Sequence, residues 1–310
     1  MHNITSGRKV KGFLYDLKRN RSLLAMVLLP IALVLVFSYA TMPYGIIIAF
    51  QDYEPLRGLQ KSSFVGLKNF RKFLSYYDLG LLFRNTIILN VYDLCLAWVP
   101  MFFALVLYHC PFHRLTKLLN SASLMPMYIS TVILCSITQR FLRTDGMLND
   151  IRAVFGATPT NYLVNGPLFY TVYVLSGVWS STGQSAIIYS ALLADRSNAQ
   201  HRAAQLDGAS LMKRIIYIDL PLMLPLFCVN LAFRAGAILA NNYEKILLFM
   251  NTANQNYARV LSLYSYEVVF ESIRPQYSLS AAIGILTALV NLSLFALVSW
   301  LTKRWEVHDE

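Results

Sequence analysis

Charged residues are scarce in this sequence. Of its 310 residues, 14% are Asp, Glu, Lys or Arg and 56% are hydrophobic, whereas roughly a quarter of an ordinary soluble domain is charged. Acidic residues are the scarcer kind, with 16 against 27 basic residues and a net charge of +11. The composition excludes a typical soluble domain and indicates a polytopic membrane protein. Because the basic residues lie in loops between long apolar runs, lipid headgroups and topology explain the charge better than nucleic acid.

Several catalytic and metal-binding motifs are missing. The sequence has no G-x-x-x-x-G-K-[ST] phosphate loop, so it cannot bind ATP by that device, and no G-x-S-x-G nucleophile motif. It has four cysteines without C-x-x-C spacing, which we interpret as small core residues and not as a disulfide framework or metal site. We therefore expect a single membrane domain that is not an enzyme and binds no cofactor or metal itself.

Apolar runs of about 20 residues, the length that crosses a bilayer, predict an all-α protein with six transmembrane helices. A signal peptide is an alternative for the first run, because Ser38-Tyr39-Ala40 resembles a cleavage site. Basic residues are denser in the segments assigned to the inside, which favours cytoplasmic termini. We expect a cytoplasmic segment at 1–22, a transmembrane domain at 23–304 and a cytoplasmic tail at 305–310. The six predicted spans are 23–40, 84–107, 119–141, 168–194, 217–240 and 280–301.

One polar island interrupts the second half of the chain, between two apolar runs. Residues 198–206 are mostly helix formers behind a capping-competent Ser197-Asn198. Asp207-Gly208 then breaks the pattern: Gly208 suits the left-handed position after a helix, and Asp207 suits the cap of the next one. We expect a short helix, a tight turn and a second helix that runs into Leu220-Pro221. A nine-residue helix is marginal alone, so it should rest against another surface.

Polar residues also occur at membrane depth. The fourth predicted span contains GVWSSTGQS, where an aromatic and neutral hydrogen-bonding groups suit a sugar site but equally suit helix packing in lipid. Asp93 lines a transport path or makes an interhelical hydrogen bond, and Arg234 lines a water-filled path or reaches toward headgroups. If Arg234 lines the path, it favours an acidic or strongly polar saccharide. The residues His109 and His113 have the spacing of a metal pair, but Pro111 and nearby cations favour a solvated turn.

The polar island resembles the cytoplasmic coupling loop of importer-type ABC permeases, whose pattern is Glu-Ala-Ala, two residues, Asp-Gly-Ala and, about ten residues later, Leu-Pro. Arg202 departs from that pattern, because it stands where the family usually has Glu. Other segments resemble carbohydrate-importer permeases, among them PYGIIIAFQDY and VGLKNF. The predicted coupling loop spans 195–216. Its predicted ATPase-coupling residues, with the Leu-Pro that follows, are Arg202, Ala203, Ala204, Asp207, Gly208, Ala209, Leu220 and Pro221.

The resemblance implies a permease subunit of a type I ABC importer that moves a carbohydrate, for which we expect an oligosaccharide, into a prokaryotic cell. Its expected partners are a second permease, two cytoplasmic ATPases that use ATP and Mg, an extracytoplasmic sugar-binding protein, and membrane lipid. Family analogy places sugar contacts on the spans that flank the coupling loop. An ion-coupled secondary carrier is the alternative, and it would use Asp93 and Arg234. The predicted substrate-path residues are Trp179, Ser181, Gln184, Arg234 and Asn241.

Overall fold

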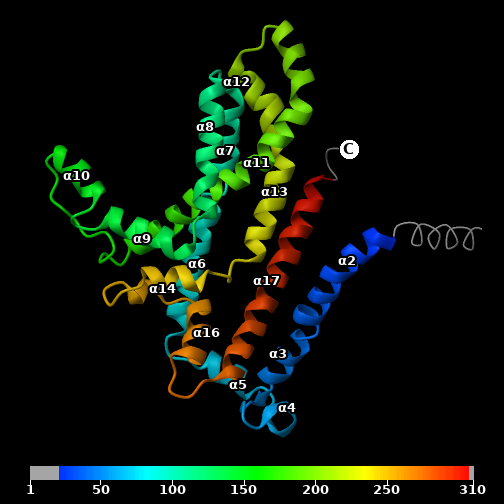
Figure 1. Ribbon diagram of the computed structural model, residues 1–310, viewed down its shortest axis with the longest axis vertical. Coiled ribbons are helices and arrows are strands. Elements are labelled where there is room, and N and C mark those ends of the chain that lie inside the picture. The colour runs from blue at the N-terminus through cyan, green and yellow to red at the C-terminus, as the bar shows by residue number, and fades with distance from the viewer. Residues whose placement is uncertain (1–20, 307–310) are drawn as a thin grey trace, which may run out of the picture.

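A computed structural model describes residues 21–306, and the rest of the predicted N-terminal segment and tail lie outside this range. The regular secondary structure of the described chain is almost wholly helical, as predicted (Figure 1). Its one sheet in this range pairs β1 (Gln51–Asp52) antiparallel with β2 (Ser63–Phe64). The helices up to the middle of the chain are α2 (Arg21–Val34), η1 (Leu35–Tyr39), α3 (Met42–Ala49), α4 (Gly58–Lys61), α5 (Lys68–Leu74), α6 (Leu79–Cys95), α7 (Val99–His109), α8 (His113–Leu124), η2 (Met125–Tyr128), α9 (Thr131–Leu142) and α10 (Met147–Val154).

The second half begins with the longest helix of the described chain and then turns back on itself. Its elements are α11 (Leu168–Leu206), α12 (Leu211–Arg214), η3 (Ile215–Asp219), α13 (Leu220–Gly236), α14 (Tyr243–Phe249), α15 (Gln255–Ala258), α16 (Leu261–Phe270) and α17 (Tyr277–Glu306).

Four stretches are long and apolar enough to cross a membrane, and a bent helix pair makes a fifth if it counts as one span. The 39-residue α11 is long enough to cross, but its run of Ser, Thr and Gln lowers its hydropathy. The chain is thus a multi-pass all-α membrane protein, while the count of six spans stays a prediction. The four stretches are Ala25–Ala49, Leu79–His109, Leu211–Gly236 and Tyr277–Trp300.

The predicted third span is not one straight helix. The segments on either side of residues 129–130 are bent by 109°. Ile129 and Ser130 are extended, and the Ser130 hydroxyl accepts a hydrogen bond from the Ile133 amide, which starts a new helix there. In Figure 1, α8 stands upright beside α7, whereas α9 lies across the molecule toward α10. The apolar pattern from 119 to 141 predicts one span because the residues at the break are themselves compatible with a helix.

The predicted short helix at 198–206 is not separate either. These residues form the last turns of α11, which continues through them without a break. Asp207 is the C-cap of α11, and the N-cap of α12 is Ser210, so the predicted cap role of Asp207 is wrong. The predicted turn is confirmed, because Gly208 has φ +75. A long helix therefore carries the polar island out of the apolar core, and no independent short helix has to be stabilised.

The family-like motif VGLKNF packs the N-terminal third against α17. The Asn69 side chain is buried and donates hydrogen bonds of 2.9 Å to the carbonyls of Ala49 and Gln51. Phe70 joins Ala49 and Ala282 of α17 in a small buried cluster. These contacts tie the end of α3 to α5 and α17 at the lower end of Figure 1, so the motif is structural in this chain.

Candidate functional site

The hairpin between α11 and α12 is an exposed polar feature at the end of the longest described helix. The Gly208 amide donates to the Gln205 carbonyl at 3.1 Å, and the Ala209 amide donates to the Ala204 carbonyl at 2.9 Å. This pair of bonds is the Schellman arrangement, which requires a left-handed residue at its turn. Only glycine takes that conformation without steric cost, so the Asp-Gly sequence fixes where α11 ends.

The hairpin offers an apolar contact surface bordered by charge. Leu206 is 89% exposed and Met212 is 63% exposed, so two large apolar side chains are accessible close to the turn. Arg202 and Asp207 are also exposed beside them, and Ala203 is exposed between them. Figure 1 places the hairpin at one extreme of the molecule, beyond the ends of α7 and α8. Small residues and exposed apolar tips at the end of a rigid helix suit a docking surface for another protein.

A polar cavity of about 350 Å³ lies in the middle of the molecule, where α6, α11, α13 and α14 meet. Its walls carry charged and amide side chains together with hydroxyls, in contrast to the apolar cores around it. Such a mixture of donors and acceptors in a concave site fits a polar ligand. The polar residues that line the cavity are Asn90, Asp93, Tyr173, Ser180, Ser181, Arg234, Asn241, Asn242 and Lys245.

Two helices contribute an ion pair to this cavity. The Arg234 guanidinium on α13 donates to the Asp93 carboxylate on α6, and the two side chains are 31% and 40% exposed. The interhelical contact expected for Asp93 is therefore present, and the carboxylate also lines the cavity; its role in a transport path stays a prediction. Arg234 also lines the cavity. A pair of opposite charges in such a setting avoids leaving either charge alone in a poorly solvated site.

Lys245 adds a second cation that the sequence interpretation missed. It is buried, its ammonium donates to the Tyr173 carbonyl at 2.6 Å, and it lies 4.5 Å from the centre of the Tyr173 ring. Burial lowers the pKa of Lys245 to about 8, against the opposing effect of the nearby Cys135 and Asp93. With Asp93, Arg234 and Lys245 ionised, the three charged lining residues sum to +1. The sequence signal that could have identified this cation is a single lysine in the otherwise apolar segment KILLF.

An unused acceptor also belongs to the cavity wall. The side-chain oxygen of Asn241 is buried and has no hydrogen-bond partner among the described residues, although Asn241 lines the cavity. A buried polar atom without a partner costs free energy, on the order of 1–3 kcal/mol. A ligand hydroxyl would supply the missing donor.

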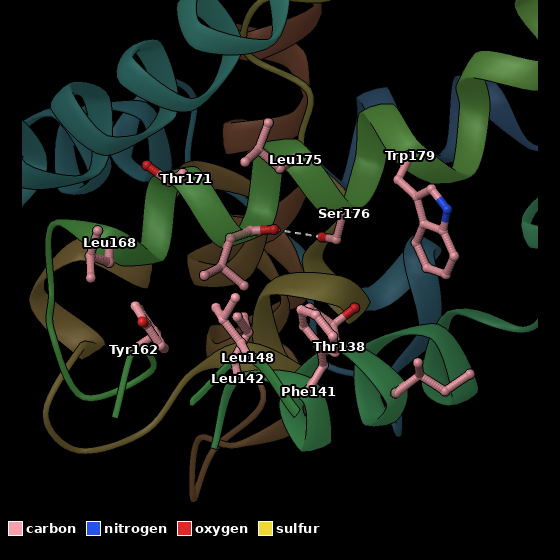
Figure 2. Close-up of a pocket in the computed structure, with 12 residues that line it drawn as sticks. Thr138, Phe141, Leu142, Leu148, Tyr162, Leu168, Thr171, Leu175, Ser176 and Trp179 are labelled. Atoms are coloured by element: carbon pink, nitrogen blue, oxygen red, sulfur yellow. Dashed lines mark hydrogen bonds between the residues drawn. The ribbon is translucent and has the colours of Figure 1, made fainter. Parts of the chain in front are cut away.

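The predicted substrate-path residues separate into three groups. The structure brings Ser181, Arg234 and Asn241 together around the polar cavity. Trp179 instead lines a second, apolar cavity of about 630 Å³ between α11 and α9, and Gln184 lines neither. Figure 2 shows Trp179 at the edge of that cavity, with the α9 residues Thr138 and Phe141 among its lining side chains. The roles of all five residues stay predictions, but a serine and a tryptophan two positions apart on one helix face different cavities.

Comparison with known proteins decides the family. Residues 86–307 match the model of the family described as the binding-protein-dependent transport system inner membrane component. The chain belongs to this family of permeases. The match covers the polar cavity and the hairpin alike, and a permease subunit is a transport component, not the ATPase.

Individual relatives of this permease are similar over nearly their whole length. The chain is 31% identical over 299 residues to the polygalacturonan/rhamnogalacturonan transport system permease protein YteP of Bacillus subtilis (strain 168), covering 96% of this chain and 92% of that one. It is 28% identical to Protein LplB of the same organism, over 98% and 95% of the two chains. Thus the similarity extends beyond the family's shared segment.

A solved structure agrees with the fold of this permease. A chain of a bacterial ABC transporter involved in the import of the acidic polysaccharide alginate matches with a TM-score of 0.82 and 27% identity. The match covers 94% of this permease and 98% of that chain. A bacterial alginate ABC transporter has also been solved in complex with an alginate pentasaccharide-bound periplasmic protein, and its matching chain has a TM-score of 0.81.

Proposed function

We propose that this permease is the membrane subunit of an ABC importer that carries an acidic oligosaccharide into the cytoplasm. The observation that carries the proposal is the polar cavity, where Arg234 and Lys245 outnumber Asp93 among amide and hydroxyl groups. A net positive cavity favours carboxylates, and hydroxyl-bearing rings suit its neutral donors and acceptors. The names of the similar permeases, for polygalacturonan and rhamnogalacturonan and for alginate, support the same substrate class.

The energy source is a pair of separate ATPases in this proposal. The exposed hairpin around Gly208 is the surface on which an ATPase docks, with Leu206 and Met212 as its apolar contacts. Since α11 runs without a break from the cavity-lining Ser181 to the hairpin, displacement of the hairpin tilts the cavity wall. That motion switches the cavity between outward and inward access. The hairpin and both termini then lie on the cytoplasmic side.

The proposal includes two further partners, which the family and the exposed surface support. A second permease packs beside this one to enclose the path, and an extracytoplasmic binding protein delivers the sugar. The helix α2 and its π-helical extension form a large exposed apolar surface, which includes Met26, Leu29 and Phe37. Either the second permease or lipid would cover this surface in the membrane.

The experiment is to purify the permease from membranes together with the proteins that accompany it and to measure ATP hydrolysis. Binding protein loaded with an oligouronate should stimulate hydrolysis several-fold more than the same protein loaded with a neutral oligosaccharide of equal length or left empty. Arg202, which replaces the usual Glu, should be matched by an acidic residue on the ATPase, and Arg202→Glu should weaken co-isolation. A permease that co-isolates with no ATPase would contradict the proposal.

A further inference from the structure

A buried carboxylate joins three elements just below the hairpin. Asp219, at the end of η3, is fully buried. One of its oxygens accepts a hydrogen bond of 2.7 Å from Nε2 of His109, the last residue of α7, and the other accepts one of 2.8 Å from Nε2 of His201 on α11. A carboxylate only accepts, so both imidazoles carry a proton on Nε2. One side chain thus bridges the elements on both sides of the hairpin to α7.

A metal ion is the other reading of this group, since the ligand atoms of His109, His201 and Asp219 lie within 4.8 Å of one another. The surroundings of the other ring nitrogen of His201, Nδ1, argue against a metal ion. A metal held by Nε2 puts the proton on Nδ1, and ligating histidines normally donate that proton to a partner. Nδ1 of His201 is buried and has no hydrogen-bond partner among the described residues. With the proton on Nε2 instead, Nδ1 is a lone pair, which is less costly to bury unpaired than an N–H.

Two of these elements, α7 and α11, share an apolar core with α13, the helix that follows η3. Leu105 of α7, Leu193 of α11 and Met223 of α13 belong to one buried cluster. In Figure 1, α7 and α8 stand alongside the last turns of α11 and α12. The bridge thus adds directional, charge-assisted hydrogen bonds to helices that already share an apolar core. None of its three residues lines the polar cavity, so the bridge does not contact a ligand held there.

We propose that Asp219 is a positioning residue that makes α7 move as one body with the hairpin. The inference rests on the proposed function, because it concerns how a displacement of the hairpin reaches the cavity. Without the bridge, only apolar packing would pass a displacement of the hairpin from α11 to α7. With it, α7 follows and carries α6 with its Asp93, the part of the cavity wall that is covalently distant from the hairpin. Hydrolysis and transport then stay coupled.

The test uses His109, whose side chain is 13% exposed and therefore tolerates substitution better than the fully buried Asp219. His109→Phe removes the donor and keeps a ring, while His109→Gln keeps an N–H donor of similar reach. His113→Phe, at an exposed position four residues away, is the matched control. Each variant is assembled with its ATPases and second permease in liposomes, and both sugar uptake and ATP hydrolysis stimulated by loaded binding protein are measured.

We expect His109→Phe to lower the ratio of sugar transported to ATP hydrolysed at least fivefold, while hydrolysis stays within about twofold of wild type. We expect His109→Gln and His113→Phe to keep the ratio. An unchanged ratio in His109→Phe would overturn the proposal, and so would an equal loss of both activities, because a packing defect gives that result. If His109→Phe does not assemble, the ratio of sugar transported to ATP hydrolysed is measured in His109→Leu, with the same results expected and excluded. Absence of stimulated hydrolysis in the wild type would instead count against the proposed function.

Discussion

The Asp93–Arg234 pair and Lys245 give the polar cavity its charge, and each comes from a different helix. Asp93 lies on α6, Arg234 on α13 and Lys245 on α14, so their meeting depends on tertiary structure. Asp93 and Arg234 were recognisable in the sequence because ionisable residues are rare in apolar runs. Their pairing was not, since 141 residues separate them and nothing local specifies a contact.

Substitutions that change this charge should change which sugar is carried. Arg234→Met lowers the sum of the three lining charges from +1 to 0, whereas Asp93→Asn raises it to +2. A charge-assisted hydrogen bond contributes about 1.5–3 kcal/mol, so Arg234→Met should reduce uptake of an acidic oligosaccharide by about ten- to a hundredfold. Uptake of a neutral oligosaccharide by the same variant is the control. Equal losses for both sugars would show that Arg234 only maintains the fold.

Lys245 should make this selectivity depend on pH. Its pKa is lowered to about 8 by burial, so the cation is present below that value and is lost as the pH rises through it. We expect the preference for acidic over neutral oligosaccharide to fall between pH 7 and pH 9 in the wild type. Lys245→Met should have the high-pH preference throughout. Uptake ratios across this range in both proteins measure the effect, and a pH profile unchanged by Lys245→Met would contradict it.

At the scale of elements, α11 is the helix on which the account depends, because it links the cavity to the hairpin. The sequence predicts the turn correctly, since Asp-Gly after helix formers is a strong local signal and Gly208 is indeed left-handed. The sequence wrongly predicts a separate short helix before the turn. The change to polar residues at 198 suggests that a new helix begins there, although α11 continues through them. The bend at residues 129–130 escapes prediction for the converse reason: an apolar composition suggests continuity.

Substitution of Gly208 should abolish coupling and leave membrane insertion unchanged. A Cβ at Gly208 would meet open space, so only the backbone conformation of this residue is restrictive. Gly208→Pro cannot reach a positive φ and should abolish uptake without lowering the amount of permease in the membrane. Gly208→Asn is the control, because asparagine tolerates this conformation and should retain most uptake. Normal uptake with proline at this position would contradict the coupling role of the hairpin.

Close packing of α11 on α8 makes a second prediction at this scale. A Cβ on Gly183 would lie 2.2 Å from the Ser123 carbonyl oxygen, a clash with backbone that a rotamer change cannot relieve. Gly183→Ala should destabilise the permease by about 1–3 kcal/mol and lower its melting temperature in detergent. Gly284→Ala on α17 is the matched control, since that helical site is open. Its melting temperature should stay the same or rise, and equal behaviour of the two variants would contradict the packing.

At the scale of the whole molecule, the continuous helix α11 joins a central polar cavity to a distant, exposed hairpin. In the proposed function, this subunit is driven from outside its own chain. The rival is a carrier that uses the Asp93–Arg234 pair to couple to an ion gradient. These accounts differ in what supplies the energy, and composition alone cannot distinguish them.

Uptake into liposomes that contain the purified assembly is the most direct measurement. With loaded binding protein outside and ATP inside, the account predicts accumulation of the oligosaccharide that persists when ionophores collapse every ion gradient and stops when ATP is replaced by a non-hydrolysable analogue. Accumulation driven by an imposed proton or sodium gradient with this chain alone, in the absence of ATP, would contradict it.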